Sequence, residues 1–162
     1  MIDSEIRQQT YQFFLEEAPE LLQILETGLL NLKQKLSPAL VHDLMRAAHS
    51  LKGGAATVGL DALAMIAHRL ESIVRGLYSD KVELDTELET WLLQAYDCLK
   101  EPLQQQINQG SFAEESALAS ADLVFSKIET RLGDILKEAE HYIPSSTDLG
   151  VDMVSSIFEV DV

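Results

Sequence analysis

The chain contains a single cysteine, Cys98, among its 162 residues. One thiol excludes an intrachain disulfide, so the fold is expected to depend on its hydrophobic core, as is usual in a reducing cytoplasm. Cys98 lies at helical spacing from Ala95 and Trp91, which predicts a small buried apolar side chain rather than a reactive thiol.

Long apolar runs and an excess of basic residues are also missing. No stretch of 18 consecutive apolar residues occurs, so no membrane insertion is expected, and the N-terminal sequence does not resemble a signal peptide. There are 12 basic residues against 27 acidic ones, for a net charge of −15. This charge argues against nucleic acid and anionic membranes as partners and predicts partners with basic docking faces. The single cysteine predicts a cytoplasmic protein.

Aromatic residues are few, at 6% of the chain, and only four prolines occur, far apart. Hydrophobic residues nevertheless reach 46%, enough for a packed core, and leucine and alanine are abundant among them. This composition favours helix over strand. The sequence therefore predicts an all-α fold: an antiparallel four-helix bundle with an additional C-terminal fifth helix.

Apolar residues at helical spacing predict where these helices lie. The expected helices cover residues 3–35, 38–58, 61–77, 85–110 and 112–142. Pro19 should kink the first helix or split it in two, because proline lacks a backbone donor. Ser37 and Pro38 suit the start of the second helix, and Asp61 could cap the third.

The chain is expected to divide into a helical domain, residues 1–142, and an acidic tail, residues 143–162. The tail has acidic residues but no lysine or arginine, and its apolar residues lack a regular helical period. It is interpreted as a linker or tail leading to further domains.

The segment AHSLKGGAATVGL, residues 48–60, is the most informative part of the sequence. His49 lies on the flank of the apolar stripe of its helix, so its ring should be half exposed. Gly53 and Gly54 each cost about 1 kcal/mol in a helix, which suggests a site where bare backbone lets a large partner approach. A break or a close helix crossing would explain the glycines equally well. Lys52 adds a cation within one turn of His49.

The third helix carries His68 and Glu71 three residues apart, on one face. If this face meets His49, the Glu71 carboxylate would accept a hydrogen bond from one ring nitrogen and make the other a better nucleophile. Such a histidine could carry a phosphoryl group. Lys52 would then stabilise the phosphoryl oxygens, and His68 would tune the network.

Other interpretations of the histidines remain open. A lone helical histidine is often structural, and His42 and His141 are predicted to be surface residues. A zinc site formed by His49, His68 and Glu71 is conceivable, since two histidines and a carboxylate can bind metal. No HExxH or CxxC spacing supports it, so neither a metal nor a cofactor is expected in this chain.

The glycine-rich segment resembles the histidine-phosphotransfer motif H-[ST]-x-K-G-[GS]-[AS]-x-x-x-G. It is similar to the N-terminal domain of chemotaxis-type histidine kinases, as are YQFFLEEAPELLQILETGLLNL before it and LDALAMIAHRLESIV after it, and the resemblance covers residues 1–140. It implies that His49 is phosphorylated and that Lys52, His68 and Glu71 support it. The expected docking residues are Arg46, Gly53, Gly54 and Ala56.

The resemblance also implies partners. A histidine kinase catalytic domain, using ATP and magnesium, would phosphorylate His49, and a response-regulator receiver domain would take the phosphoryl group onto an aspartate. The chain has no G-x-x-x-x-G-K-[ST] motif, so it is expected to be the phosphotransfer part of a larger kinase and a monomer in isolation. The alternative is a non-catalytic helical interaction module that docks signalling partners.

Overall fold

A computed structural model describes residues 4–139, and this part of the chain contains six helices and no strand. They are α1 (Ser4–Asn31), α2 (Pro38–Thr57), α3 (Asp61–Gly76), α4 (Thr86–Gln109), α5 (Glu114–Leu132) and α6 (Asp134–Ala139). The predicted all-α class is confirmed. Across these residues no helix is both long enough and apolar enough to cross a membrane. The predicted tail 143–162 and His141 lie outside the described residues.

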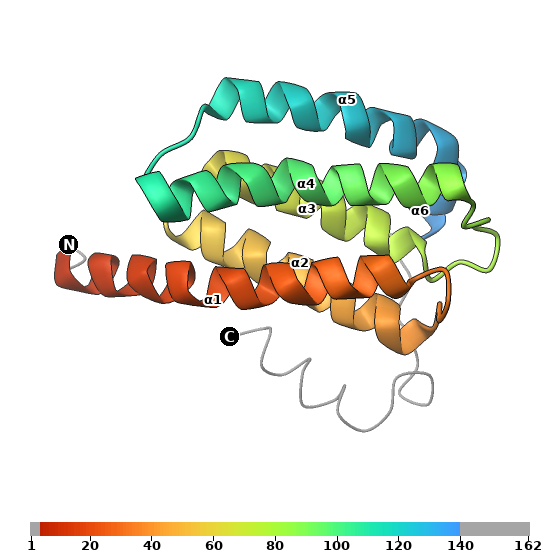
Figure 1. Cartoon of the computed structure of the whole chain (residues 1–162), viewed down its shortest axis with the longest axis horizontal. Coiled ribbons are helices and arrows are strands. Elements are labelled where there is room, and N and C mark those ends of the chain that lie inside the picture. The colour runs from red at the N-terminus through yellow and green to blue at the C-terminus, as the bar shows by residue number, and fades with distance from the viewer. Residues whose placement is uncertain (1–3, 140–162) are drawn as a thin grey trace.

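The first four helices form an antiparallel bundle, in which α1 packs on α2 and α4, and α3 packs on the same two helices (Figure 1). Short links reverse the chain between successive helices, so helices adjacent in sequence are also neighbours in space. The fifth helix covers α3 and α4, and α6 packs on α3. This arrangement places α2 between α1 and α3, the two helices that complete the candidate site.

Local signals in the sequence fix three of the helix ends. The Ser37 side chain accepts a hydrogen bond from the Leu40 amide at 3.2 Å, with Pro38 in the first turn, as predicted. The Asp85 side chain caps α4 in the same way, accepting from Leu88 at 2.9 Å. Gly110 ends α4 in the left-handed conformation, with φ of 80°.

Two predictions about the helices are not met in full. The sequence predicted that Pro19 would kink or split the first helix, and α1 runs uninterrupted from Ser4 to Asn31 with Pro19 inside it, so the split does not occur. Packing of α1 on both neighbours outweighs the single lost backbone hydrogen bond. Asp61 is not the cap of α3, because Leu60 occupies that position and no side chain caps the helix. Asp61 instead supplies negative charge in the first turn, which favours the helix dipole.

The predicted fifth helix, 112–142, is also wrong as a single element. α5 ends at Leu132 because Gly133 adopts a positive φ of 44°, and a short helix, α6, follows. Leu136 of α6 lies over Gly76 of α3, where an added Cβ would be 2.7 Å from the leucine Cδ2. Gly133 thus turns the chain back onto the bundle. Gly76 has no side chain and so leaves room there for Leu136.

The core is formed by apolar side chains from all four bundle helices and from α5. Its largest fully buried members are Phe125, Leu25, Leu29, Leu32, Leu44, Leu51, Leu63, Ile66, Leu70, Ile73, Leu88 and Leu92. Three large apolar residues of α1, Ile6, Phe13 and Ile24, lie outside this core and are 55%, 64% and 46% exposed. The apolar residues of α1 spread over more of its circumference than the contacts with α2 and α4 cover.

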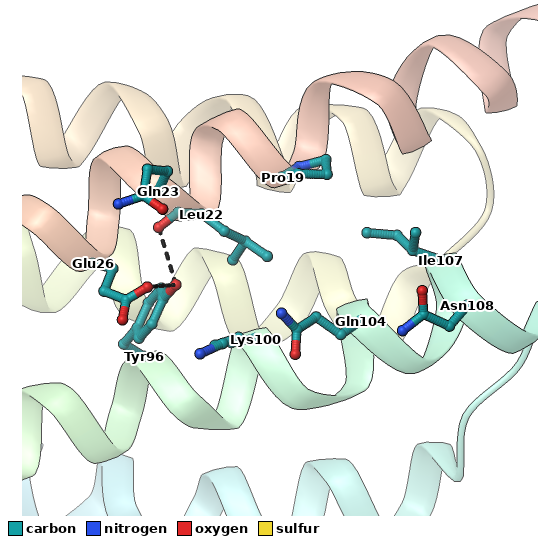
Figure 2. A pocket seen from close by; sticks show the side chains of 9 residues that line it. All are labelled: Pro19, Leu22, Gln23, Glu26, Tyr96, Lys100, Gln104, Ile107 and Asn108. Carbon is teal, nitrogen blue, oxygen red and sulfur yellow. Dashed lines mark hydrogen bonds between the residues drawn. The ribbon is translucent and has the colours of Figure 1, made fainter.

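A cleft lies between α1 and α4, and one of its lining residues joins the two helices by a hydrogen bond (Figure 2). The hydroxyl of Tyr96 on α4 donates a hydrogen bond to the backbone carbonyl of Leu22 on α1 at 3.0 Å. This contact lies close to Pro19, which lines the same cleft. It joins α4 to α1 about one turn beyond Pro19, a separate place from the Leu15 carbonyl that the missing proline amide would have bonded.

Cys98 is partly buried on α4, and its thiol lies 3.8 Å from the Ser120 carbonyl of α5. Burial raises the pKa of this thiol, and the nearby charges of Glu101 and Asp97 raise it further. A thiol with a raised pKa is a poor nucleophile, so the residue behaves as the predicted packing side chain.

Candidate functional site

His49 of α2 and Glu71 of α3 meet across the contact between these two helices. The imidazole Nδ1 lies 2.5 Å from Oε2 of Glu71, and the histidine side chain is 39% exposed. The predicted meeting of the two helix faces and the half exposure of His49 are both confirmed. A carboxylate oxygen only accepts, so Nδ1 carries the hydrogen that joins the pair.

Glu71 is buried, with only 4% of its surface exposed, yet both its oxygens are occupied. Oε1 accepts a hydrogen bond from Nζ of Lys52 at 2.8 Å while Oε2 holds His49. Burial alone would raise the pKa of this carboxyl. The hydrogen bond from Lys52 and the charges of His49 and Lys52 outweigh burial and hold the pKa below its ordinary value. Glu71 is therefore a fixed anion beneath the exposed histidine.

His68 stands at the edge of this cluster. Its Nδ1 is 3.8 Å from Oε1 of Glu71, which is beyond hydrogen-bond distance, and its side chain is 62% exposed. The structure therefore brings three of the four predicted site residues into direct contact. It leaves His68 able to act on Glu71 only through its charge.

The arrangement fixes which nitrogen of His49 can react. With its proton on Nδ1 and donated to Glu71, a neutral ring has its free lone pair on Nε2. Nε2 makes no hydrogen bond with any residue that the structure describes, and it is not among the buried unpaired atoms. A carboxylate that holds one nitrogen and orients the ring leaves the other as an accessible nucleophile.

A groove runs along His49 between α1 and α2. Its lining residues are Thr10, Phe13, Phe14, Glu17, Leu21, Arg46, His49, Ser50, Gly53, Gly54, Thr57 and Val58. The expected docking residues Arg46, Gly53 and Gly54 are therefore beside His49. Ala56 is exposed on α2, but it does not line the groove.

The two adjacent glycines have different surroundings. A Cβ added to Gly53 would meet no atom within 4 Å, whereas one added to Gly54 would lie 2.6 Å from Cδ1 of Phe14. Gly54 thus permits the close approach of α1 and α2. A close helix crossing was one of the explanations that the sequence left open for the paired glycines. Gly53 is the glycine whose bare backbone faces open space, and the docking roles of both remain predictions.

Sequence reasoning missed the apolar wall of this groove. Phe13 is exposed, and Leu21 is only partly buried. Ile6, Phe13 and Ile24 recur at spacings of seven and eleven residues, which places them on one face of α1. We refer to Ile6, Phe13, Leu21 and Ile24 as the α1 apolar face. The spacing of these residues can be recognised in the sequence, but only the position of α2 in the bundle shows that the face is exposed.

The prediction that His42 is a surface residue is also wrong. It is 8% exposed, and neither ring nitrogen has a hydrogen-bond partner among the described residues. Burial lowers its pKa, and the charge of Arg46 lowers it further, while Asp43 acts in the opposite direction. The residue lies seven positions before His49 on α2, where the apolar stripe of the helix is wider than the sequence pattern suggested.

Within residues 4–139 no group of three or more histidine, cysteine, aspartate or glutamate residues is placed to hold a metal ion. The candidate set of the sequence, His49, His68 and Glu71, fails in its geometry. Both carboxylate oxygens of Glu71 already have partners, Nδ1 of His49 and Nζ of Lys52, so neither is open to a metal ion.

A helical bundle with a half-exposed histidine, oriented by a buried carboxylate on the neighbouring helix, has the features of a histidine phosphotransfer domain. Comparison with protein families agrees, since the model described as Hpt domain matches residues 9–109. The chain belongs to the Hpt domain family.

Similar curated proteins are chemotaxis proteins. The chain is 30% identical over 134 residues to the chemotaxis protein CheA of Treponema pallidum, covering 82% of this chain and 14% of that protein. It is 39% identical over 96 residues to CheA of Klebsiella aerogenes, covering 57% of this chain and 14% of that protein. The chain therefore spans about one seventh of the length of these relatives.

A solved structure shares the fold. The phosphorylated P1 domain of CheA3, in complex with CheY6 from R. sphaeroides, superposes with a TM-score of 0.64 at 22% identity. The match covers 78% of this chain and 98% of that one. At this identity the likeness establishes the arrangement of the helices, which agrees with the family assignment.

Proposed function

We propose that this chain is the phosphocarrier domain of a two-component phosphorelay and that Nε2 of His49 holds the phosphoryl group. The observation that carries this function is the 2.5 Å contact between Nδ1 of His49 and the buried carboxylate of Glu71. A docking surface alone would need no such contact. A nucleophilic imidazole needs this contact, because the carboxylate sets the tautomer of the ring and stabilises the positive charge that the ring gains on attack.

The transfer balances without an external base. The lone pair of Nε2 forms the bond to phosphorus while the bond from phosphorus to the leaving group breaks, and the leaving group departs with its electron pair. The proton on Nδ1 stays in place, hydrogen-bonded to Glu71, and the ring becomes positive against an ionised carboxylate. Discharge onto an aspartate reverses these steps and restores the neutral ring.

The donor and the acceptor follow from the family. A histidine kinase catalytic domain, with ATP and magnesium, would load His49, and a receiver domain of a response regulator would accept the group. Both partners operate in the cytoplasm, and one bundle is sufficient for the chemistry, so a monomer serves as the isolated domain. The CheA3 domain with the same fold is known in complex with CheY6.

The α1 apolar face supports docking of such a receiver. Phe13 and Leu21 line the groove beside His49, so a partner that covers them also reaches the imidazole. Apolar side chains exposed beside a reactive group are typical of an interaction surface. Gly53 leaves the backbone open on the α2 side of the same groove.

The test is phosphorylation by a chemotaxis-type kinase domain with radiolabelled ATP, comparing wild type with His49→Gln. Label that is labile in acid and stable in base, present on wild type and absent from the variant, would establish phosphohistidine at His49. His68→Gln is the matched control, because His68 is an exposed histidine near the same carboxylate and should keep the label.

Label retained in His49→Gln would overturn the assignment. A wild type that takes no label from the kinase or from phosphoramidate, a small chemical donor, would favour the alternative function. In that case the α1 apolar face would serve a docking module without phosphotransfer.

A further inference from the structure

Arg46 is a half-buried cation without an anionic partner. Its Nε is buried and has no hydrogen-bond partner, and no carboxylate within residues 4–139 lies at ion-pair distance from its guanidinium. Arg69 and Arg131 behave differently, since each binds two carboxylates. Buried polar atoms are usually paired, so an unpaired guanidinium nitrogen calls for a ligand or a function.

The position of Arg46 relates it to His49. The two residues are three apart on α2 and Gly53 is seven after Arg46, so all three lie on one face of the helix. All three also line the groove between α1 and α2. Glu17 is the carboxylate among the lining residues, and it lies beyond ion-pair distance of Arg46. The guanidinium is therefore an available positive charge in the groove that gives access to the imidazole.

The other cation near His49 is already engaged. Nζ of Lys52 donates to Oε1 of Glu71 at 2.8 Å, so much of its charge is neutralised by that carboxylate. A phosphoryl group on Nε2 would bring three oxygens and a charge of roughly −1.5 to −2 at neutral pH. Its oxygens need a cation that has no other partner. The planar fork of an arginine can bind two of them at once.

We propose that Arg46 is the ligand of the phosphoryl oxygens on phosphorylated His49, whereas Lys52 acts on the histidine only through Glu71. This inference rests on the proposed function of His49. In the loading step Arg46 binds two oxygens of the incoming phosphoryl group while the bond to Nε2 forms and the bond to the leaving group breaks. Arg46 keeps its protons and stays charged throughout.

The experiment uses phosphoramidate as the donor, so that no partner protein contributes. Wild type, Arg46→Gln, Arg46→Lys and the control Arg75→Gln are compared, since Arg75 lies near the end of α3 and does not line the groove. The initial rate of His49 labelling should fall about tenfold or more in Arg46→Gln and partly recover in Arg46→Lys. Arg75→Gln should stay within about twofold of wild type.

Two spectroscopic readouts separate a ligand from a structural residue. In the phosphorus NMR spectrum of the phosphorylated protein, the titration midpoint of the phosphoryl group should rise by about half a pH unit or more in Arg46→Gln, because a cation favours the dianion. The Arg46 Nε–H resonance of wild type should also shift on phosphorylation. This second measurement needs no variant to fold.

The outcomes distinguish the two proposals. If wild type is phosphorylated but the Arg46 resonance does not move, and Arg46→Gln matches wild type in rate and titration midpoint, this inference fails alone. If wild type takes no phosphoryl group from phosphoramidate, the proposed function fails and this inference fails with it. A titration midpoint that moves in Lys52→Gln instead would assign the phosphoryl oxygens to Lys52.

Discussion

Nζ of Lys52 and Oε1 of Glu71 form a 2.8 Å ion pair across the contact between α2 and α3. The sequence predicted that Lys52 would stabilise the phosphoryl oxygens. The structure places its ammonium on a carboxylate that is 4% exposed and that also holds His49. Lys52 is therefore coupled to the reactive histidine through one shared side chain.

This coupling makes the effects of Lys52 and Glu71 non-additive. We expect Lys52→Ala to slow phosphorylation of His49 by the kinase about tenfold, or 1.4 kcal/mol of barrier. In a Glu71→Gln background the same change should slow the residual rate by less than about twofold, because the shared partner is already altered. Initial rates for the four proteins of this cycle provide the check. Equal effects in both backgrounds would show that Lys52 acts independently of Glu71.

Glu71 should also control stability in acid. Its pKa in the folded protein is held below the ordinary value of 4.5, so the unfolded chain takes up a proton first as the pH falls. The stability from this group is fully present above about pH 4.5 and is lost as the pH falls through the lower, folded pKa. Glu71→Gln should therefore lose less stability than wild type between pH 5 and pH 3. Urea unfolding at several pH values measures this, and parallel curves would contradict it.

His42 should destabilise the fold at mildly acidic pH. Burial lowers its pKa from 6.5, so below pH 6.5 the unfolded chain binds a proton that the folded protein refuses. The free energy of unfolding of wild type should fall as the pH drops from 7 toward 5.5. His42→Leu should reduce this slope. A wild-type slope in His42→Leu would show that His42 is not the responsible group.

The two adjacent glycines should respond in opposite directions to the same substitution. Gly53→Ala adds a methyl group to open space on a helix and should raise the free energy of unfolding by about 0.5–1 kcal/mol. Gly54→Ala should lower it by about 1–3 kcal/mol, because its Cβ would lie 2.6 Å from Cδ1 of Phe14. Thermal or urea unfolding decides between these outcomes. Stabilisation by Gly54→Ala would show that Phe14 can move away at little cost.

A larger side chain at residue 53 should separate docking from chemistry. Gly53→Gln should fold as well as wild type, because nothing lies within 4 Å of the added Cβ. It should slow transfer to a receiver domain about tenfold or more, equivalent to at least 1.4 kcal/mol, by obstructing the groove. Labelling by phosphoramidate, a far smaller donor, should change by less than about threefold. Unimpaired transfer to the receiver would remove Gly53 from the docking surface.

Much of the site was readable from sequence because its signals are local. The helical periodicity, the spacing of His68 and Glu71, and the paired glycines after His49 required only helix geometry. The short link between the second and third helices made them antiparallel neighbours, which brought His49 and Glu71 together as predicted. The cap at Ser37 and the stop at Gly110 were correct for the same local reasons.

The errors came from features that depend on packing between distant segments. The single long fifth helix was wrong, because Gly133 turns α6 onto Gly76 of α3, far away in sequence. Of the two effects predicted for Pro19, a kink or a split, the split does not occur, because contacts with two neighbouring helices hold α1 together. Propensity and periodicity contain no information about such neighbours.

By itself the sequence determined the helical class and the positions of the first four helices, and it singled out His49 as the candidate reactive histidine, because these follow from the local preferences of the backbone and from residue spacing. Only the tertiary structure decided that Lys52 pairs with Glu71 and that Arg46 remains without an anionic partner among the described residues. It also decided that Phe13 forms an open wall beside His49 instead of part of the core. Which charges pair and which apolar faces stay uncovered depends on how helices lie against one another, and that is settled only when the whole bundle packs.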